Sequence, residues 1–194
     1  MSITTLILIV TIITSFWALQ NEEQLRKLIF NPYTVKQNNE WHRFLTHAFI
    51  HADFVHLGVN MYVLWMFGSA IEEAIGSNNF ILLYAGGIIF ASIPSYLKHQ
   101  NNHYYNSLGA SGAVASVVFA FVLIYPSSML YLMAIIPLPA WLFGILYLMY
   151  EAYMDKKAND KIAHDAHFYG ALWGILFTGF SNPDYFLSFF DKIL

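Results

Sequence analysis

The chain of 194 residues contains no cysteine and few charged residues. Without cysteine it can form neither a disulfide nor a zinc–thiolate site, and it offers no thiol nucleophile. Aspartate, glutamate, lysine and arginine together make up 11% of the chain, against about a quarter in ordinary soluble domains. The formal net charge is only −3 and no basic cluster is present, so neither nucleic acid nor an acidic partner is indicated.

Apolar residues are correspondingly abundant, at 58% of the chain, and 18% of all residues are aromatic. So few charges cannot cover a globular surface, which indicates that lipid solvates much of the chain. Six stretches are apolar enough to cross a membrane, and these are residues 3–20, 54–75, 79–97, 111–125, 132–153 and 164–180. We therefore expect an all-α integral membrane protein, built as a single domain over residues 1–194.

The longest segment between these stretches comprises residues 21–53. It is semi-polar and carries aromatic side chains such as Trp41 and Phe44, so we expect it to lie partly in the membrane interface. The first stretch has no basic segment before it and no small-residue cleavage site after it, which favours a retained span over a signal peptide. Pro137 and Pro139 interrupt the helical pattern of the fifth stretch and predict a loop or re-entrant turn there.

Ser111 begins the fourth stretch, which is short. From Ser111 to Tyr125 a helix rises roughly 22 Å, whereas the hydrocarbon core is about 30 Å thick. A helix that starts below the membrane surface presents unpaired N–H groups, which water or a ligand must meet. Gly109 and Gly112 let a substrate backbone approach the hydroxyl, and amides at a helix start favour an oxyanion. Serine is also a preferred helix cap, so a purely structural role is the alternative.

His167 lies in the sixth stretch and is the second polar residue within a segment expected to span the membrane, where burying a polar side chain costs free energy. Imidazole titrates near neutral pH and is the usual base for a hydroxyl nucleophile. Gly170 and Gly174 share a helical face near His167, and such a face permits close packing of helices. A histidine that only hydrogen-bonds between helices would give the same pattern.

His56 and Asn60 lie one helical turn apart on the second stretch. Both side chains can donate a hydrogen bond to an anionic oxygen, as an oxyanion site requires. In isolation they would be interpreted as interhelical hydrogen bonds. Because a serine and a histidine of the required kind occur elsewhere in the chain, we favour oxyanion binding.

Taken in order, the motifs resemble those of the rhomboid intramembrane serine proteases. They are RFLTHAFIH at 43–51, HLGVNM at 56–61, Gly68, Glu72, GASG at 109–112 and AHFYG at 166–170. The resemblance covers residues 41–174. It implies a six-helix bundle with a long, partly membrane-associated first loop and endopeptidase activity without a cofactor or a bound metal. It also implies transmembrane segments of other proteins as substrates, and we expect a multi-pass protein of a bacterial plasma membrane.

The resemblance implies roles for the site residues. Ser111 would be the nucleophile and His167 its base, acting as a dyad without an orienting carboxylate, so we do not expect Asp165 to be a third member. The Ser111 N–H, His56 and Asn60 would bind the oxyanion.

The resemblance also implies supporting residues. His51 matches a structural histidine where the first loop meets the second helix, and Arg43 and Glu72 match polar residues that stabilise that loop. Gly170 matches the glycine at which the two catalytic helices touch. We expect the remaining small residues of the motifs, Gly109, Gly112 and Gly174, to support the same packing.

One position departs from the family pattern. Many members carry an aromatic residue four positions after the nucleophile, where it stacks on the imidazole, and here that residue is Ala115. Another aromatic side chain is then needed against His167. The candidates are Tyr62, Trp65 and Tyr169.

Two other functions stay open. His47 and His51 are one turn apart, as are His164 and His167, so a metal-dependent hydrolase or metal transporter is one alternative, although no His-Glu-x-x-His motif is present. A catalytically inactive relative that binds membrane proteins is the other. Such relatives lack the nucleophile or the base, whereas this chain has both.

Two indications of the orientation in the membrane conflict with each other. Most basic residues fall in or beside the odd-numbered loops, which the positive-inside rule places in the cytoplasm. The resemblance instead places these loops, and the opening of the active site, on the outside. We favour the resemblance, because loops embedded in the membrane need not follow the charge rule.

Overall fold

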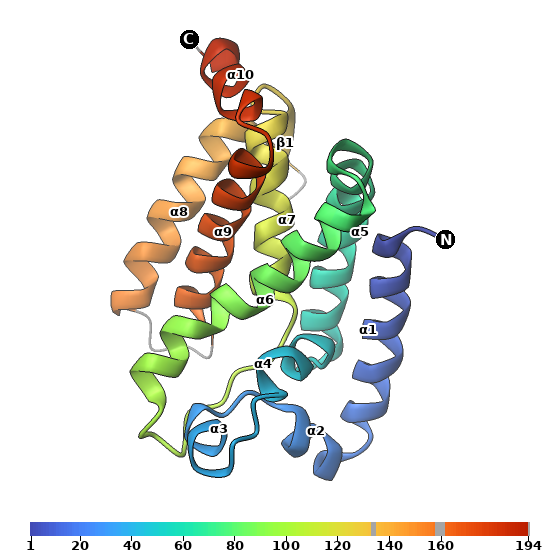
Figure 1. The fold of residues 1–194 in the computed structure, drawn as a ribbon, viewed down its shortest axis with the longest axis vertical. Coiled ribbons are helices and arrows are strands. Elements are labelled where there is room, and N and C mark those ends of the chain that lie inside the picture. The colour runs from blue at the N-terminus through green and yellow to red at the C-terminus, as the bar shows by residue number, and fades with distance from the viewer. Residues whose placement is uncertain (133–134, 158–161, 194) are drawn as a thin grey trace.

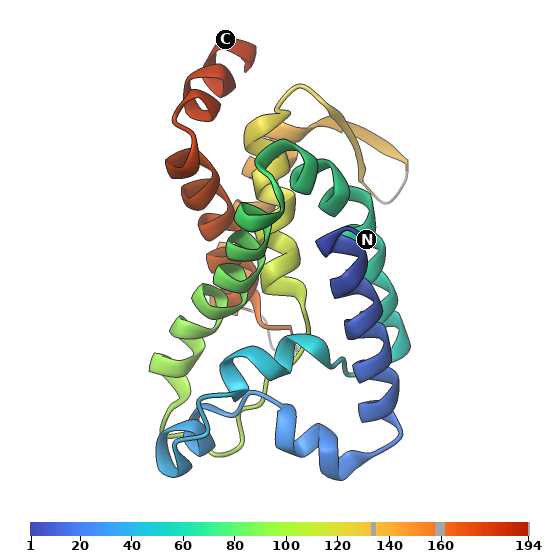
Figure 2. The same ribbon diagram turned by 45° about the vertical axis from the view of Figure 1, so that its right-hand side comes forward.

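Helix α7 (Ser111–Ile124) lies at the centre of the fold, and all of its residues except Ser111 and Phe121 are buried. The structure is a computed structural model that describes residues 1–132, 135–157 and 162–193. Three long helices pack directly on α7, as Figure 1 and Figure 2 show, and these are α5 (Phe54–Ile75), α6 (Ser77–His99) and α9 (His164–Ser181). The central helix is therefore shielded on several sides.

The remaining long helices form an outer layer. Helix α1 (Ile3–Leu19) packs on α5, α8 (Ala140–Lys157) packs on α9 and α7, and α10 (Asp184–Ile193) contacts α7 and α9. These helices expose large apolar side chains such as Ile13 on α1 and Met149 on α8. Helices α5 and α6 are long and apolar enough to cross a membrane, while α1 and α7 are apolar but shorter.

The segment before α5 folds into four short helical pieces, α2 (Glu22–Leu28), α3 (Pro32–Asn38), α4 (Arg43–Thr46) and η1 (His47–Phe49). Asn21 caps α2 and Asn31 caps α3, each by accepting a hydrogen bond from a backbone N–H in the first turn. Helices α3 and α4 pack on α6. The long first loop is thus ordered and anchored to the bundle.

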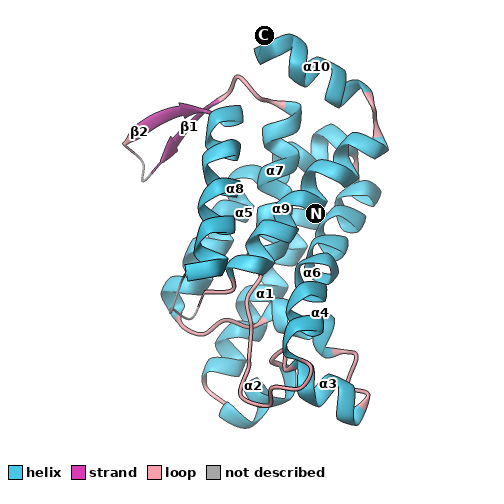
Figure 3. Cartoon of the chain, turned by 90° about the vertical axis from the view of Figure 1, so that its left-hand side faces the viewer, coloured by secondary structure: helices cyan, strands magenta, loops and turns pink. Residues whose placement is uncertain are grey.

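A β-hairpin replaces the start of the fifth expected stretch. Strands β1 (Met129–Leu132) and β2 (Ile136–Pro139) pair antiparallel, and α8 begins only at Ala140. Proline fits the edge of such a two-stranded ribbon but not a helix interior. The expected span 132–153 therefore starts too early, its residues 133 and 134 lie outside the described residues, and the all-α description omits this hairpin. Figure 3 shows the hairpin at the same end of the bundle as α10 and opposite α2 and α3.

The other expected stretches coincide closely with α1, α5, α6, α7 and α9. The sequence did not predict α10, which follows Pro183 in the tail. The structure is thus mostly helical, and the apolar stretches are its main elements.

Candidate active site

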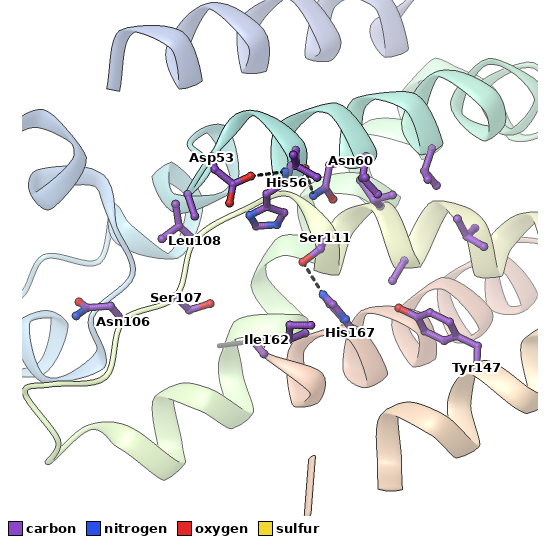
Figure 4. Close-up of a pocket in the computed structure, with 18 of the residues that line it drawn as sticks. Asp53, His56, Asn60, Asn106, Ser107, Leu108, Ser111, Tyr147, Ile162 and His167 are labelled. Atoms are coloured by element: carbon purple, nitrogen blue, oxygen red, sulfur yellow. Dashed lines mark hydrogen bonds between the residues drawn. The ribbon is translucent and has the colours of Figure 1, made fainter. Parts of the chain in front are cut away.

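Ser111 and His167 are hydrogen-bonded, with 2.8 Å between the serine Oγ and the histidine Nε2. Ser111 is the first residue of α7, and the N-cap position is occupied by Ala110 without a side-chain hydrogen bond. The serine hydroxyl therefore does not cap the helix, and the alternative that Ser111 serves as a helix cap is wrong. Figure 4 shows the hydroxyl directed at the imidazole from the start of α7.

Glycines bring the two helices that carry this pair into contact. A Cβ atom at Gly170 would overlap the carbonyl oxygen of Gly112, and one at Gly174 would overlap the carbonyl oxygen of Ser116. Only glycine permits α9 to approach the backbone of α7 so closely. The sequence placed these glycines on the face that the structure uses.

Glu151 on α8 is the residue that sequence reasoning missed. Its Oε1 lies 3.1 Å from Nδ1 of His167, and its Oε2 lies 2.6 Å from Nδ1 of His164. The expectation of a dyad without a carboxylate neighbour is thereby corrected. A signal was present, because Glu151 is the only charged residue in the stretch 132–153, and an ionisable residue in an apolar segment is a functional candidate.

Asp165 lies apart from the Ser111–His167 pair despite its place on α9. Its Oδ2 accepts a hydrogen bond of 2.7 Å from Ser95 on α6, and its Oδ1 accepts one from the N–H of Ala166. These contacts tie the start of α9 to α6. Asp165 is therefore not the carboxylate beside the imidazole.

His56 and Asn60 reach the same cavity from α5, whose start is capped by Asp53. The Asn60 amide donates one hydrogen bond of 2.9 Å to the carbonyl of His56, which leaves its second N–H available. Gly109 adopts a φ of 116°, and a Cβ there would lie 2.6 Å from the His56 ring. Glycine at that position therefore makes room for the imidazole.

One cavity of about 950 Å³ unites these groups. Figure 4 shows Ser111 between His56 and His167, and the cavity wall includes residues of α5, α7, α8, α9 and the loop before α7. Much of the wall is apolar, with Val59, Val63 and Phe143 among the lining side chains. A few polar groups thus converge in an apolar cavity, as is usual for binding sites.

His51 holds the start of α7 in place. The N–H of Ala110 donates to its Nε2 at 3.3 Å, so its Nδ1 carries the proton and donates to Ser15 at 2.9 Å. Burial lowers the pKa of His51 to about 3, so the ring is neutral at neutral pH. This geometry fits the structural role implied for it at the junction of loop and helix.

Arg43 and Glu72 act in different parts of the molecule. Buried Arg43 pairs with Glu40 at 2.6 Å and donates to the carbonyls of Arg26 and Ile29, all within the first loop. Glu72 instead accepts hydrogen bonds from the N terminus of α1 and from the start of α6. The expectation that Glu72 stabilises the first loop is therefore corrected, because its partners lie at the opposite end of α1.

None of the three aromatic candidates covers the His167 ring. Tyr62, Trp65 and Tyr169 are between 43% and 63% exposed, and none has its ring packed on this imidazole. Among the described residues, the ring nearest to His167 is that of His164, with 6.3 Å between the centroids. A carboxylate at its edge, rather than an aromatic face, holds the imidazole.

The four histidines proposed as a metal cluster do not converge. His47 bonds to Ser92 at 3.0 Å and His51 bonds to Ser15 at 2.9 Å, and neither belongs to the cluster that contains His164 and His167. Within the described residues, one group of three potential ligands has its donor atoms within 4.8 Å, namely Glu151, His164 and His167. In this group both histidines are already hydrogen-bonded to Glu151. The four-histidine site is therefore wrong.

Known proteins provide a comparison. Residues 38–181 match the rhomboid domain. The chain is 29% identical over 174 residues to RHOMBOID-like protein 12, mitochondrial, of Arabidopsis thaliana, which covers 80% of this chain and 51% of the relative. It is 33% identical over 135 residues to Rhomboid protein 1, mitochondrial, of Saccharomyces cerevisiae (67% and 39% covered). It is 32% identical over 144 residues to the human Presenilin-associated rhomboid-like protein, mitochondrial (71% and 37% covered).

The chain spans about half or less of the length of these relatives. All three are named as mitochondrial proteins, so the expectation of a bacterial plasma membrane is wrong, whereas location in a membrane is supported. The match to the rhomboid domain covers most of the 194 residues and includes the cavity with its serine and histidine. The chain belongs to the rhomboid family.

Proposed function

We propose that the chain is an intramembrane serine endopeptidase that hydrolyses peptide bonds in or near transmembrane segments of other membrane proteins. The observation that carries the proposal is the hydrogen bond of 2.8 Å between Ser111 and His167 inside a cavity of about 950 Å³. A serine within reach of an imidazole is the arrangement of an activated hydroxyl nucleophile. The reaction requires no cofactor.

The proposed membrane arrangement is a bundle of six spans formed by α1, α5, α6, α7, α8 and α9. The exposed apolar faces of the outer helices favour contact with lipid. Helix α7 contains 14 residues and rises only about 21 Å, so its first turn starts within the bundle. Water in the cavity then reaches Ser111 below the membrane surface.

The first chemical step is attack of Ser111 on the scissile carbonyl. Nε2 of His167 accepts the hydroxyl proton while Oγ forms a bond to the carbonyl carbon. The carbonyl oxygen becomes negatively charged as the centre turns tetrahedral. The protonated imidazole then gives its proton to the leaving amine as the C–N bond breaks, which leaves an acyl-enzyme.

The oxyanion is bound by donors on both sides of Ser111. The N–H of Ser111 lies at the positive end of the α7 dipole, and the side chains of His56 and Asn60 approach from α5. In the second step water attacks the acyl group, and His167 takes the water proton and returns it to Oγ. The enzyme is then restored.

The cavity wall indicates the substrate. It combines apolar side chains of α5 and α8, such as Val59 and Phe143, with polar groups only at the reacting centre. An apolar segment of a membrane protein fits such a wall, provided that its helix unwinds at the cleaved bond. A carbonyl inside a helix is already hydrogen-bonded and shielded. We expect small residues beside that bond.

The decisive experiment is proteolysis of a model transmembrane substrate by the purified protein and its Ser111→Ala and His167→Ala variants. Each variant is expected to lose roughly 10⁴-fold or more of the turnover, because nucleophile and base act as a unit. Ser116→Ala is the matched control. Ser116 is a buried serine on the same helix whose hydroxyl bonds to Ala113, outside the cavity lining.

A second arm tests the oxyanion donors. Asn60→Ala is expected to lower kcat by ~10²-fold or more, as the loss of one such donor does elsewhere. Asn79→Ala is its control, because Asn79 makes the same amide-to-carbonyl bond to the preceding turn, at 2.9 Å, but is exposed and does not line the cavity. Full activity of Ser111→Ala would refute the proposal. A wild-type protein that neither cleaves nor reacts with a serine-directed phosphonate would indicate an inactive relative.

A further inference from the structure

We infer that Glu151 is a positioning residue for His167. The proposed catalytic group then consists of Ser111, His167 and Glu151, rather than of Ser111 and His167 alone. The inference rests on the proposed protease function. His167 uses both ring nitrogens, with Nε2 at 2.8 Å from the Ser111 hydroxyl and Nδ1 at 3.1 Å from Oε1 of Glu151. Serine, histidine and carboxylate in this order have the relation of a serine-protease triad.

The carboxylate determines which nitrogen of His167 carries the proton. An ionised carboxylate can only accept hydrogen bonds, so the ring must present Nδ1–H to Glu151. Nε2 is then unprotonated and accepts the hydrogen bond of the serine hydroxyl, as a general base must. The same negative charge faces the ring when it becomes positive after proton transfer. Without Glu151 either nitrogen could carry the proton.

Glu151 is itself fixed. Its second oxygen, Oε2, lies 2.6 Å from Nδ1 of His164, which precedes His167 by nearly one turn on α9. Both Glu151 and His164 are 3% exposed, so water does not compete for these bonds. With one oxygen on each imidazole, the carboxylate cannot rotate without breaking a hydrogen bond.

Two other roles for the same contacts make different predictions. A purely structural link between α8 and α9 would affect stability and leave the turnover of folded protein unchanged. A metal site would require a cation among donor atoms that now lie within 4.8 Å and share protons. That cation would displace Nδ1–H from both rings. The position of the proton on His167 and the turnover number therefore separate these roles.

The test compares Glu151→Gln and Glu151→Leu with the wild-type protein in detergent micelles. We expect kcat to fall ~10²–10⁴-fold for both variants with KM little changed, in line with removal of the carboxylate from other triads. Nitrogen-15 spectra of labelled histidine, assigned with His167→Ala, report the tautomer directly. The wild-type ring is expected to show Nδ1–H, and the Glu151→Leu ring a mixture of tautomers.

Asp165→Asn is the matched control. It makes the same change from carboxylate to amide on the helix of His167, but its side chain bonds to Ser95 instead of to the imidazole. We expect its turnover and its His167 tautomer to equal those of the wild-type protein. Thermal unfolding of every variant separates loss of folding from loss of turnover, and the tautomer of His167 is measured on the wild-type protein itself, with His167→Ala used only to assign its signals.

Three results would overturn the inference. They are a wild-type His167 that carries its proton on Nε2, a folded Glu151→Leu variant with wild-type kcat, and zinc that copurifies and is required for activity. If Ser111→Ala remained active, both the proposed function and the inference about Glu151 would fail. Loss of activity in Ser111→Ala together with full activity in Glu151→Gln would reject only the role of Glu151.

Discussion

Two buried glutamates hold two different corners of the molecule. At the Glu72 corner, formed by Ile3, Thr4, Glu72 and Ser77, the carboxylate accepts hydrogen bonds of 2.8 to 2.9 Å from backbone N–H groups and hydroxyls. At the Glu151 corner, formed by Ser111, Glu151, His164 and His167, the carboxylate faces two imidazoles. Both glutamates lie on apolar helices and are less than 10% exposed, at 8% and 3%.

The difference lies in the partners. Amides and hydroxyls keep their protons near neutral pH, so Glu72 can only join α1 to α5 and α6. Imidazoles move protons between two nitrogens, so Glu151 also decides where a proton lies. Burial and charge alone would assign both residues the same role. The chemistry of the partner separates a structural carboxylate from one coupled to the proposed reaction.

Among substitutions that leave the polar side chains of both corners in place, Gly170→Ala is expected to have the largest effect, because it moves apart the helices of the Glu151 corner without changing a charge. A Cβ there would overlap the carbonyl oxygen of Gly112, so α9 must move away from α7 and carry His167 away from Ser111. A displacement of about 1 Å can lower turnover ~10²-fold. We expect a loss of that size in kcat, measured by steady-state cleavage of a transmembrane substrate.

Two further glycines serve as controls for this prediction. A Cβ at Gly68 would lie 2.6 Å from the Thr4 side chain at the Glu72 corner, so Gly68→Ala should lower stability while kcat is kept. Gly58 has no atom within 4 Å of such a Cβ and is exposed inside α5, so Gly58→Ala should keep kcat and raise stability by up to about 1 kcal/mol. Equal kcat values for the Gly170 and Gly58 variants would contradict the proposed dependence on close helix packing.

Glu72→Ala is expected to have the next largest effect, and on stability alone. It leaves the N–H groups of Ile3 and Thr4 and two hydroxyls without their acceptor, which costs about 2–3 kcal/mol for a buried charged acceptor. Thermal unfolding should shift downward by several degrees. At temperatures where Glu72→Ala is folded, its kcat should equal that of the wild-type protein. A large fall in kcat at unchanged stability would contradict the assignment of Glu72 to structure.

The sequence was sufficient for the main helices and for several of the residues around Ser111. Hydropathy located α1, α5, α7 and α9 because each is apolar over nearly its whole length. Ser111, His167, His56 and Asn60 line one cavity, as their motifs indicated. These residues could be predicted from the sequence because each is a polar residue within an apolar stretch.

The hydrogen-bond partners of the two glutamates could not be predicted from the sequence. The contact of Glu151 with His167 depends on how α8 is rotated against α9. The contact of Glu72 with Thr4 joins two residues that are 68 positions apart in the sequence. Neither distance along the chain nor helical period encodes such a rotation. The hairpin at 129–139 was missed for a related reason, since prolines indicate that a helix is broken but not what replaces it.

The smallest effect concerns buried histidines that, in the part of the chain that the structure describes, have no carboxylate partner. Both His164 and His167 bond to Glu151, whereas His47 on η1 bonds to the Ser92 hydroxyl at 3.0 Å. Burial lowers the pKa of His47 from 6.5 to about 4, so the unfolded chain binds more protons than the folded protein between these pH values. Stability is therefore complete well above pH 6.5 and falls as the pH falls towards 4, by about 1.4 kcal/mol at pH 5.5.

Thermal unfolding at pH 7.5 and 5.5 measures this loss in the wild-type protein and in His47→Gln. The glutamine amide can donate to Ser92 as the imidazole does, but it does not titrate, so the variant should lose less stability in acid. His103→Gln, at an exposed position in the loop before α7, should keep the wild-type pH dependence. His51, whose pKa burial lowers to about 3, contributes in the same direction, so part of the slope should persist in His47→Gln. An unchanged slope in that variant would show that burial of His47 does not limit stability in acid, and the contrast with the carboxylate-paired histidines would then fail.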